Sequence, residues 1–454
     1  PALQQQCAAA MNAWLTGDLD NRPCGVLICC RREEFETIVR EKLSLQGAIY
    51  LQPLTPAQIE EYFSQLNLQE VWQTLGDNAA LRELLTKPLF LSMFGLVQVQ
   101  GKFELAAWQA KATSEAKIEY LFDTYWDAVM SRDLIFDPHE KKLGWQSKTY
   151  KTKPLPERKV VRRMLVFVAQ GMERDPNVGT ELLIEKMQPS WLPKIYETII
   201  FFLIFKVVFI LAFGIILYSV SSLTLSLYRN ITLIDSLISG FVMCLFWSII
   251  YVNQEDQKIT SVEYFSLNIS KFTKKKYKKI LENIMPGLFW GIMLSLIFGL
   301  YGGMISGVIW GLFWGIIEAG KSAIKTKIYP NHGIKNSIKN ITIVLVGTAS
   351  VTLPLNCLLN NVLDMTSSDP YLSRRIITTF FLILIFTGFN KGGGDALTKH
   401  IALRIVLAWN RYVPIRFDLL LDYCTERLLI QRIGGRYRFT HKLLQDHFAK
   451  MELD

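Results

Sequence analysis

Cysteine is scarce in this sequence, and long stretches of it carry almost no charge. Seven Cys in 454 residues, without paired spacing, exclude a disulfide scaffold, and we expect the adjacent Cys29 and Cys30 to be buried, reduced thiols in the cytosol. Disorder is excluded by 27 Phe, 17 Tyr and 11 Trp. Ionisable side chains thin out between about residue 195 and about residue 400, which argues against a uniformly soluble enzyme.

The region before residue 190 has the composition of a soluble, folded segment. The chain starts at Pro1 without a signal-peptide pattern, so we expect a fragment whose upstream part is missing. The apolar run Gly25–Cys30 predicts a buried parallel strand. Arg31 follows at the strand end, where open α/β sheets bind ligands. There it either contacts a terminal phosphate or is a solvated charge at a helix start. Thr55 and Gln58 form a capping-box pattern, and helices are expected after it.

Long apolar runs dominate residues 191–400. A spanning helix needs ~20 largely apolar residues, and residues 284–317 would extend roughly 50 Å as one helix, so we expect that run to turn back near its glycines. Six membrane spans are therefore predicted, at residues 207–228, 233–252, 284–300, 303–319, 341–363 and 374–390.

Lysines gather in two of the connections between these spans. The connections after the second and fourth spans are rich in Lys, whereas those after the first and third are nearly free of Lys and Arg. Because cytoplasmic loops collect Lys and Arg, we expect a multi-pass protein of the cell membrane, in contact with the lipid bilayer, with both termini in the cytoplasm. Arg374 and Arg375 do not fit this pattern.

One phosphate-loop pattern occurs, from Gly315 to Ser322. A true phosphate loop needs a buried strand before it and a helix after it. Here the preceding run predicts a glycine-striped membrane helix, and Glu318 would place a negative charge in the cradle. We therefore interpret the pattern as a helix end, with Gly320 as its C-terminal stop.

The C-terminal end predicts a helix, a hairpin and a second helix. Residues 428–433 and 436–440 alternate as short strands around a Gly-Gly turn. The last helix is expected from His441 to about Met451, with Leu443 and Leu444 facing inward. At a helix N-terminus, His441 is either structural or placed to meet a phosphate.

Such a unit resembles a winged helix, which commonly binds nucleic acid through basic residues, here Arg432, Arg436 and Arg438. Neither a dimer seam nor a continuous basic recognition helix accompanies them. We therefore expect no nucleic-acid partner.

Several segments, in the expected order, resemble NACHT-type signalling NTPases. Residues 25–36 look like the sensor strand of that family, residues 84–92 like its helical-domain proline motif, and residues 438–449 like the end of its winged-helix domain. The apolar region, with residues 329–334 and 392–396, is similar to bacterial, cyanobacterial-like NACHT proteins that carry membrane helices.

The resemblance implies a mostly α fold with four parts. Residues 1–53 would be the end of an α/β P-loop NTPase domain, 54–190 one or more helical domains, 191–400 the transmembrane domain and 401–454 a winged-helix-like unit. It also implies a membrane-anchored switch that ADP holds closed and that exchange for ATP or GTP opens, promoting assembly into a homo-oligomer. Residues 1–190 and 401–454 should then meet in space.

The same resemblance implies three nucleotide-binding residues. Arg31 matches the residue that senses the terminal phosphate, Pro88 the residue that packs on the base, and His441 the residue that reaches the β-phosphate of the closed state. The phosphate loop and the acidic strand that binds Mg²⁺ precede the sensor strand in the family, and this chain begins too late to contain them. Alone, it is expected to bind nucleotide weakly and hydrolyse none, so no catalytic or metal-binding residue is assigned.

Two other functions stay open. A multi-pass transporter or channel with cytoplasmic accessory domains would need polar residues that converge in mid-membrane, and only the predicted fifth span offers several. A DNA-binding membrane regulator would need strongly salt-dependent duplex binding by residues 401–454.

Overall fold

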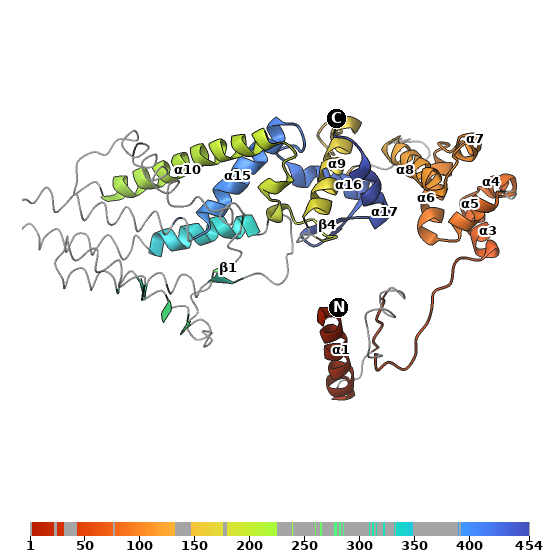
Figure 1. The fold of residues 1–454 in the computed structure, drawn as a ribbon, viewed down its shortest axis with the longest axis horizontal. Helices are drawn as coiled ribbons and strands as arrows, with labels where there is room; N and C mark the ends of the chain where they lie inside the picture. Colours follow the sequence, from red (N-terminus) through yellow and green to blue (C-terminus); the bar gives the residue numbers. More distant parts are fainter. Residues whose placement is uncertain are drawn as a thin grey trace, which may run out of the picture. The chain divides into compact units, whose positions relative to one another are not determined.

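The computed structural model describes most of the chain outside residues 225–391 (Figure 1). The described residues are 2–21, 25–30, 43–75, 78–131, 147–175, 179–224, 333–347 and 392–453, with residue 389 and short pieces between residues 238 and 331. The chain divides into two compact units, Pro1–Ser131 and Arg132–Asp454. Helices make up most of the described residues, where the strands form only two two-stranded sheets. The predicted mostly α fold is therefore confirmed.

The first helix after residue 54 begins where the sequence predicts it. Thr55 and Gln58 form the expected capping box: the Gln58 N–H donates to Thr55 Oγ1 at 3.3 Å, and the Thr55 N–H donates to Gln58 Oε1 at 2.9 Å. Pro88 takes the first helical position, where a missing N–H is tolerated. The helices are α1 (Ala2–Asn21), α3 (Pro56–Gln65), α4 (Gln69–Leu75), α5 (Ala79–Leu85), α6 (Pro88–Val99), α7 (Leu105–Gln109) and α8 (Ser114–Ser131).

Aromatic rings fill the centre of this unit. Phe63 stacks on Trp72 with ring centroids 5.5 Å apart, and it meets Phe94 edge-on at 6.0 Å. Phe63 and Phe94 are fully buried, and α6 packs against both α5 and α8. These helices therefore share one apolar core.

The predicted buried strand at Gly25–Cys30 is wrong. These residues form no strand, and Leu27 is 89% exposed. Cys29 and Cys30, expected to be buried, are exposed thiols. Apolar composition alone cannot bury a strand, because burial requires neighbouring strands and covering helices, and the described part of this unit contains no strand.

The second unit joins segments from both sides of the apolar region. Helix α9 (Arg158–Arg174) packs against α17 (Lys442–Lys450), so the segments on the two sides of the apolar region meet at these helices, as expected. The elements are α9 (Arg158–Arg174), η1 (Ile184–Lys186), η2 (Pro189–Trp191), α10 (Ile195–Thr224), β1 (Tyr264–Phe265), β2 (Lys321–Ser322), a helix over residues 333–347, α15 (Gly394–Trp409), α16 (Phe417–Glu426), β3 (Ile430–Ile433), β4 (Arg436–Phe439) and α17 (Lys442–Lys450).

Gly171 lets α9 approach the turn that precedes α10. A Cβ at this position would lie 2.2 Å from Cε3 of Trp191, which is itself fully buried. Only a residue without a side chain fits there, so the Trp191 ring of η2 packs directly against the backbone of α9 at Gly171.

The C-terminal hairpin forms as predicted. Strands β3 and β4 pair antiparallel, with Ile430 opposite Phe439, and Gly434 supplies the left-handed turn at φ 62°. On the other side of β4, the Leu182 N–H donates to Tyr437 O at 2.6 Å, and the Tyr437 N–H donates to Leu182 O at 2.9 Å. In α17, Leu444 is buried as predicted, whereas Leu443 is exposed rather than inward-facing.

The predicted multi-pass arrangement is overturned. Within the described residues, one helix is long and apolar enough to cross a bilayer, through the window Ile195–Ala212 of α10 with mean hydropathy 2.3. This does not support six spans, nor the location in the cell membrane with both termini cytoplasmic that was deduced from them. An apolar run is not sufficient, because crossing needs a continuous helix of ~20 residues. Near the predicted span 341–363, the described helix covers residues 333–347 and starts on a polar stretch. The spans predicted at 233–252, 284–300, 303–319 and 374–390 fall almost entirely outside the described residues.

The end of the phosphate-loop pattern has the wrong structure for a phosphate loop. Lys321 and Ser322 form β2 and pair with Tyr264 and Phe265 of β1, whereas a phosphate loop would begin a helix there. Residues 316–320, including the proposed stop at Gly320, lie outside the described residues.

Candidate functional site

His441 ends the hairpin and caps the last helix. Its backbone is extended (φ −147°, ψ 149°), and the Leu443 N–H donates to its Nδ1 at 3.1 Å. Because Nδ1 accepts this bond, the neutral imidazole carries its proton on Nε2. The half-buried ring therefore lies at the N-terminus of α17, where the peptide dipoles favour an anion.

The residues before His441 are held by the hairpin. The Thr440 hydroxyl donates to Leu428 O at 2.8 Å, and the Thr440 N–H donates to Leu429 O at 3.2 Å. Phe439 and Phe448 pack with ring centroids 6.0 Å apart, which fixes α17 against β4. The His441 imidazole therefore extends from a well-packed junction between β4 and α17.

The other two predicted nucleotide-binding residues are not placed beside His441. Pro88 is exposed at the start of α6 in the first unit, whereas His441 belongs to the second unit. Arg31 lies outside the described residues.

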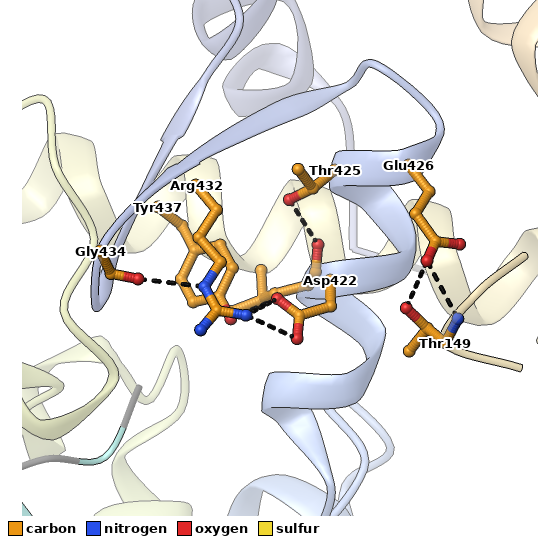
Figure 2. A network of polar contacts seen from close by, with 8 residues as sticks. Thr149, Asp422, Thr425, Glu426, Arg432, Gly434 and Tyr437 are labelled. Carbon is orange, nitrogen blue, oxygen red and sulfur yellow. Dashed lines mark hydrogen bonds and ion pairs between the residues drawn. The ribbon is translucent and has the colours of Figure 1, made fainter. Parts of the chain in front are cut away.

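Asp422 ties α16 to the hairpin (Figure 2). Its two carboxylate oxygens each accept from Nη1 of Arg432 at 3.0 Å, and the Tyr437 hydroxyl donates to Oδ1 at 2.8 Å. The Arg432 guanidinium also lies over the Tyr437 ring, 6.0 Å from its centroid, and its Nε–H donates to Gly434 O. Burial, and then the carboxylate of Asp422, raises the pKa of the Tyr437 hydroxyl above its ordinary value.

Glu426 holds a different segment at the end of the same helix (Figure 2). Its Oε1 accepts from the Thr149 hydroxyl at 2.6 Å and from the Thr149 N–H at 2.9 Å, while Oε2 accepts from the Ser147 hydroxyl at 2.7 Å. Tyr150 meets Tyr423 edge-on at 5.4 Å. Residues 147–150, which we call the strap, are therefore held to α16 by hydrogen bonds and a ring contact.

The hairpin arginines make contacts inside the unit. Arg436 Nη1 donates to Glu181 Oε2 at 2.6 Å, and Arg438 donates from Nε and Nη2 to Gln431 Oε1 at 3.1 and 3.0 Å. Together with the Arg432–Asp422 pair, these bonds engage the basic residues that a nucleic-acid-binding wing would present.

A buried polar group links α15 to the segment before α10. His400 is 3% exposed, and its Nε2 lies 3.0 Å from Ile184 O. Arg404, one turn further on, donates to Asn331 Oδ1 at 2.6 Å. Burial, and next the charge of Arg404, lowers the pKa of His400 to about 4. Burial also lowers the pKa of Arg404, whereas the charges of Asp418 and Glu185 raise it. His400 is therefore neutral at pH 7.

Sequence reasoning missed the two carboxylates of α16. Asp422 and Glu426 are spaced i,i+4 and so lie on neighbouring turns of a helix, a signal that the sequence offers. Their partners were not predictable in the same way, because Ser147 is separated from Glu426 by 279 positions.

The described ranges contain no group of three or more His, Cys, Asp or Glu side chains that could hold a metal ion. Comparison of the chain with models of protein families, with curated proteins and with solved structures gave no match. The functional inference therefore depends on the geometry of this unit and on the order of the sequence motifs.

Proposed function

We propose that this protein is a nucleotide-dependent signalling switch of the NACHT type. In this proposal α16, the β3–β4 hairpin and α17 form a winged-helix module that closes over the phosphates of bound ADP. The observation that carries it is the position of His441, which presents an imidazole at the N-terminus of α17 with Nδ1 already bonded to the Leu443 N–H.

The chemistry of the imidazole suits a phosphate. With Nδ1 accepting, the neutral ring offers Nε2–H as a donor, and phosphate oxygens are strong acceptors. The dipole of α17 adds a favourable interaction with an anion at this end of the helix. A diphosphate beside His441 would therefore bond to this module, and its exchange for a triphosphate would alter the contact.

The contacts around α16 support movement of the module as one body. Asp422 binds the hairpin that leads to His441, and Glu426 binds the strap that leads to α9. Because both carboxylates sit on one helix, displacement of His441 would pull on the strap as well. We propose that this coupling passes the nucleotide state to the rest of the chain and promotes assembly into a homo-oligomer.

The other parts of the proposed nucleotide site come from elsewhere in the chain. Pro88, exposed at the start of α6, would pack on the base, and Arg31 would sense the terminal phosphate. ATP or GTP, with Mg²⁺ in the full-length protein, is the proposed ligand. Hydrolysis is not assigned to any described residue.

Nucleotide binding by variants of the full-length protein tests the proposal. His441→Ala should weaken binding of a fluorescent ADP analogue by about ten- to a hundredfold, because a charge-assisted bond to phosphate contributes about 1.5–3 kcal/mol. The matched control is Lys450→Ala, an exposed change at the other end of α17. Equal affinity of the His441→Ala variant and the unchanged protein would overturn the assignment.

A further inference from the structure

The first turn of α17 carries a lysine directly after His441. Lys442 is the first residue of the helix, and the first turn contains no acidic side chain. A cation at this end of a helix is unfavourable, because the peptide dipoles already place partial positive charge there. The stability of α17 therefore does not explain why a lysine occupies this position.

A carboxylate one turn further along α17 holds the ammonium group of this lysine. Lys442 Nζ lies 2.8 Å from Asp446 Oδ1, and both side chains are partly exposed to solvent. Side chains on a helix tilt toward its N-terminus, so the Lys442 side chain turns back along the helix to meet Asp446. A pair with the basic residue N-terminal to the acidic one is the weaker of the two possible orders. The ion pair is therefore one that a more highly charged anion would replace.

The hairpin arginines differ from Lys442, because they pair with side chains of other segments. Arg432 pairs with α16, and Arg436 pairs with the segment before η1. Breaking either pair would loosen the hairpin from a neighbouring segment, whereas Lys442 and its partner lie on the same helix. Lys442 is therefore a basic side chain next to His441 that exchanges its partner without disturbing the contacts between segments.

We propose that Lys442 is a second phosphate-binding residue and that Asp446 competes with the nucleotide for its ammonium group. The inference rests on the proposed binding of a diphosphate beside His441. A lysine ammonium binds phosphate well as a point charge, and a diphosphate carries more negative charge than one carboxylate. When the diphosphate binds, Lys442 leaves Asp446 for a phosphate oxygen, and when it departs, the ion pair forms again. Asp446 therefore weakens nucleotide binding and favours the release of ADP.

The affinity of the full-length protein for a fluorescent ADP analogue tests this competition. Asp446→Asn frees the ammonium group, so the analogue should bind about two- to fivefold more tightly, the range expected from an exposed ion pair. Lys442→Gln should weaken binding by at least a similar factor. In the double variant, Asp446→Asn should no longer increase the affinity, because its effect depends on Lys442.

Salt dependence supplies a second readout, and another ion pair supplies the matched control. Salt screens exposed charges, so the affinity of Lys442→Gln should fall less steeply with added salt than that of the unchanged protein, and the affinity of Asp446→Asn more steeply. The control is Glu282→Gln, because Glu282 is the partner of Lys278 in a second exposed pair with the same order and spacing. This variant should change neither the affinity nor its salt dependence.

The outcomes separate this inference from the proposed function. If Asp446→Asn binds the analogue no more tightly than Glu282→Gln, or if the gain persists without Lys442, the competition is refuted. Weaker binding by His441→Ala, together with normal binding by Lys442→Gln, would reject Lys442 alone and leave the phosphate contact of His441 in place. Normal binding by His441→Ala would instead remove the phosphate site on which both proposals depend.

Discussion

Asp422 and Glu426 lie on adjacent turns of α16, and each holds a different part of the chain. Asp422 accepts hydrogen bonds from Arg432 and Tyr437 of the hairpin, and Glu426 accepts from Ser147 and Thr149 of the strap. A single short helix therefore connects the segment before α9 to the hairpin that positions His441.

Loss of the Glu426 carboxylate should release the strap. In Glu426→Gln one acceptor oxygen becomes an N–H donor, facing hydroxyl and N–H groups that now donate to it. We expect the unfolding free energy of the second unit to fall by about 1–3 kcal/mol, and amide exchange at Thr149 and Tyr150 to accelerate. Glu452→Gln, an exposed change near the C-terminus, should alter neither quantity. Unchanged amide exchange in the strap would show that the hydrogen bonds to Glu426 do not hold it.

Burial of the Tyr437 hydroxyl, together with its bond to Asp422, should make stability fall at high pH. Because the pKa of Tyr437 is raised in the folded state, the folded protein keeps a proton that the unfolded chain loses above about pH 10. Unfolding free energy should therefore decrease as pH rises through that range.

Tyr437→Phe should make this decrease less steep, while lowering stability at pH 7 through loss of the bond. Tyr412, whose pKa is raised by burial and by its bond to Glu197, contributes in the same direction, so Tyr412→Phe should also reduce the slope. Denaturant titrations at pH 7, 9.5 and 10.5 measure the effect. An unaltered slope in Tyr437→Phe would contradict the raised pKa of Tyr437 in the folded protein.

Local chemistry explains which features were predictable from the sequence. The capping box at Thr55, the Gly434 turn and His441 at a helix N-terminus each depend on neighbouring residues, and all of them form. The buried strand at Gly25–Cys30 required partners that no local pattern supplies, and it does not form among the described residues.

Long-range contacts of the candidate site were not predictable. The strap and α16 meet across the whole apolar region, and Leu182 extends the hairpin from a segment far upstream of β4. The six spans were inferred from apolar runs, a glycine turn and the distribution of Lys, none of which shows whether an apolar run forms a continuous helix.

Close packing at Gly171 should make a methyl group costly. In Gly171→Ala the added carbon would overlap the buried Trp191 ring, so α9 and η2 would have to separate. We expect a loss of about 1–3 kcal/mol in unfolding free energy, typical of an overpacked core. Gly347→Ala is a suitable control, since a Cβ there has no atom within 4 Å. A Gly171→Ala variant as stable as the control would show that α9 and η2 are less closely packed.

Acid should destabilise the second unit through His400. Its pKa is lowered to about 4 in the folded state, against about 6.5 in an unfolded chain. Between these two pH values the unfolded chain binds a proton at His400 and the folded protein does not. The stability contributed by the neutral ring is complete above pH 6.5 and is lost as pH falls towards 4, by about 3 kcal/mol in total.

His400→Gln removes this titration while keeping an amide N–H near Ile184 O. The unfolding free energy of the variant should therefore change less than that of the unchanged protein between pH 7 and pH 4.5, although its value at pH 7 should be lower because the glutamine fills the buried site less well. The difference between the two pH profiles isolates His400 from carboxylates that titrate in the same range. Parallel profiles would mean that His400 is protonated in the folded protein, despite its burial beside Arg404.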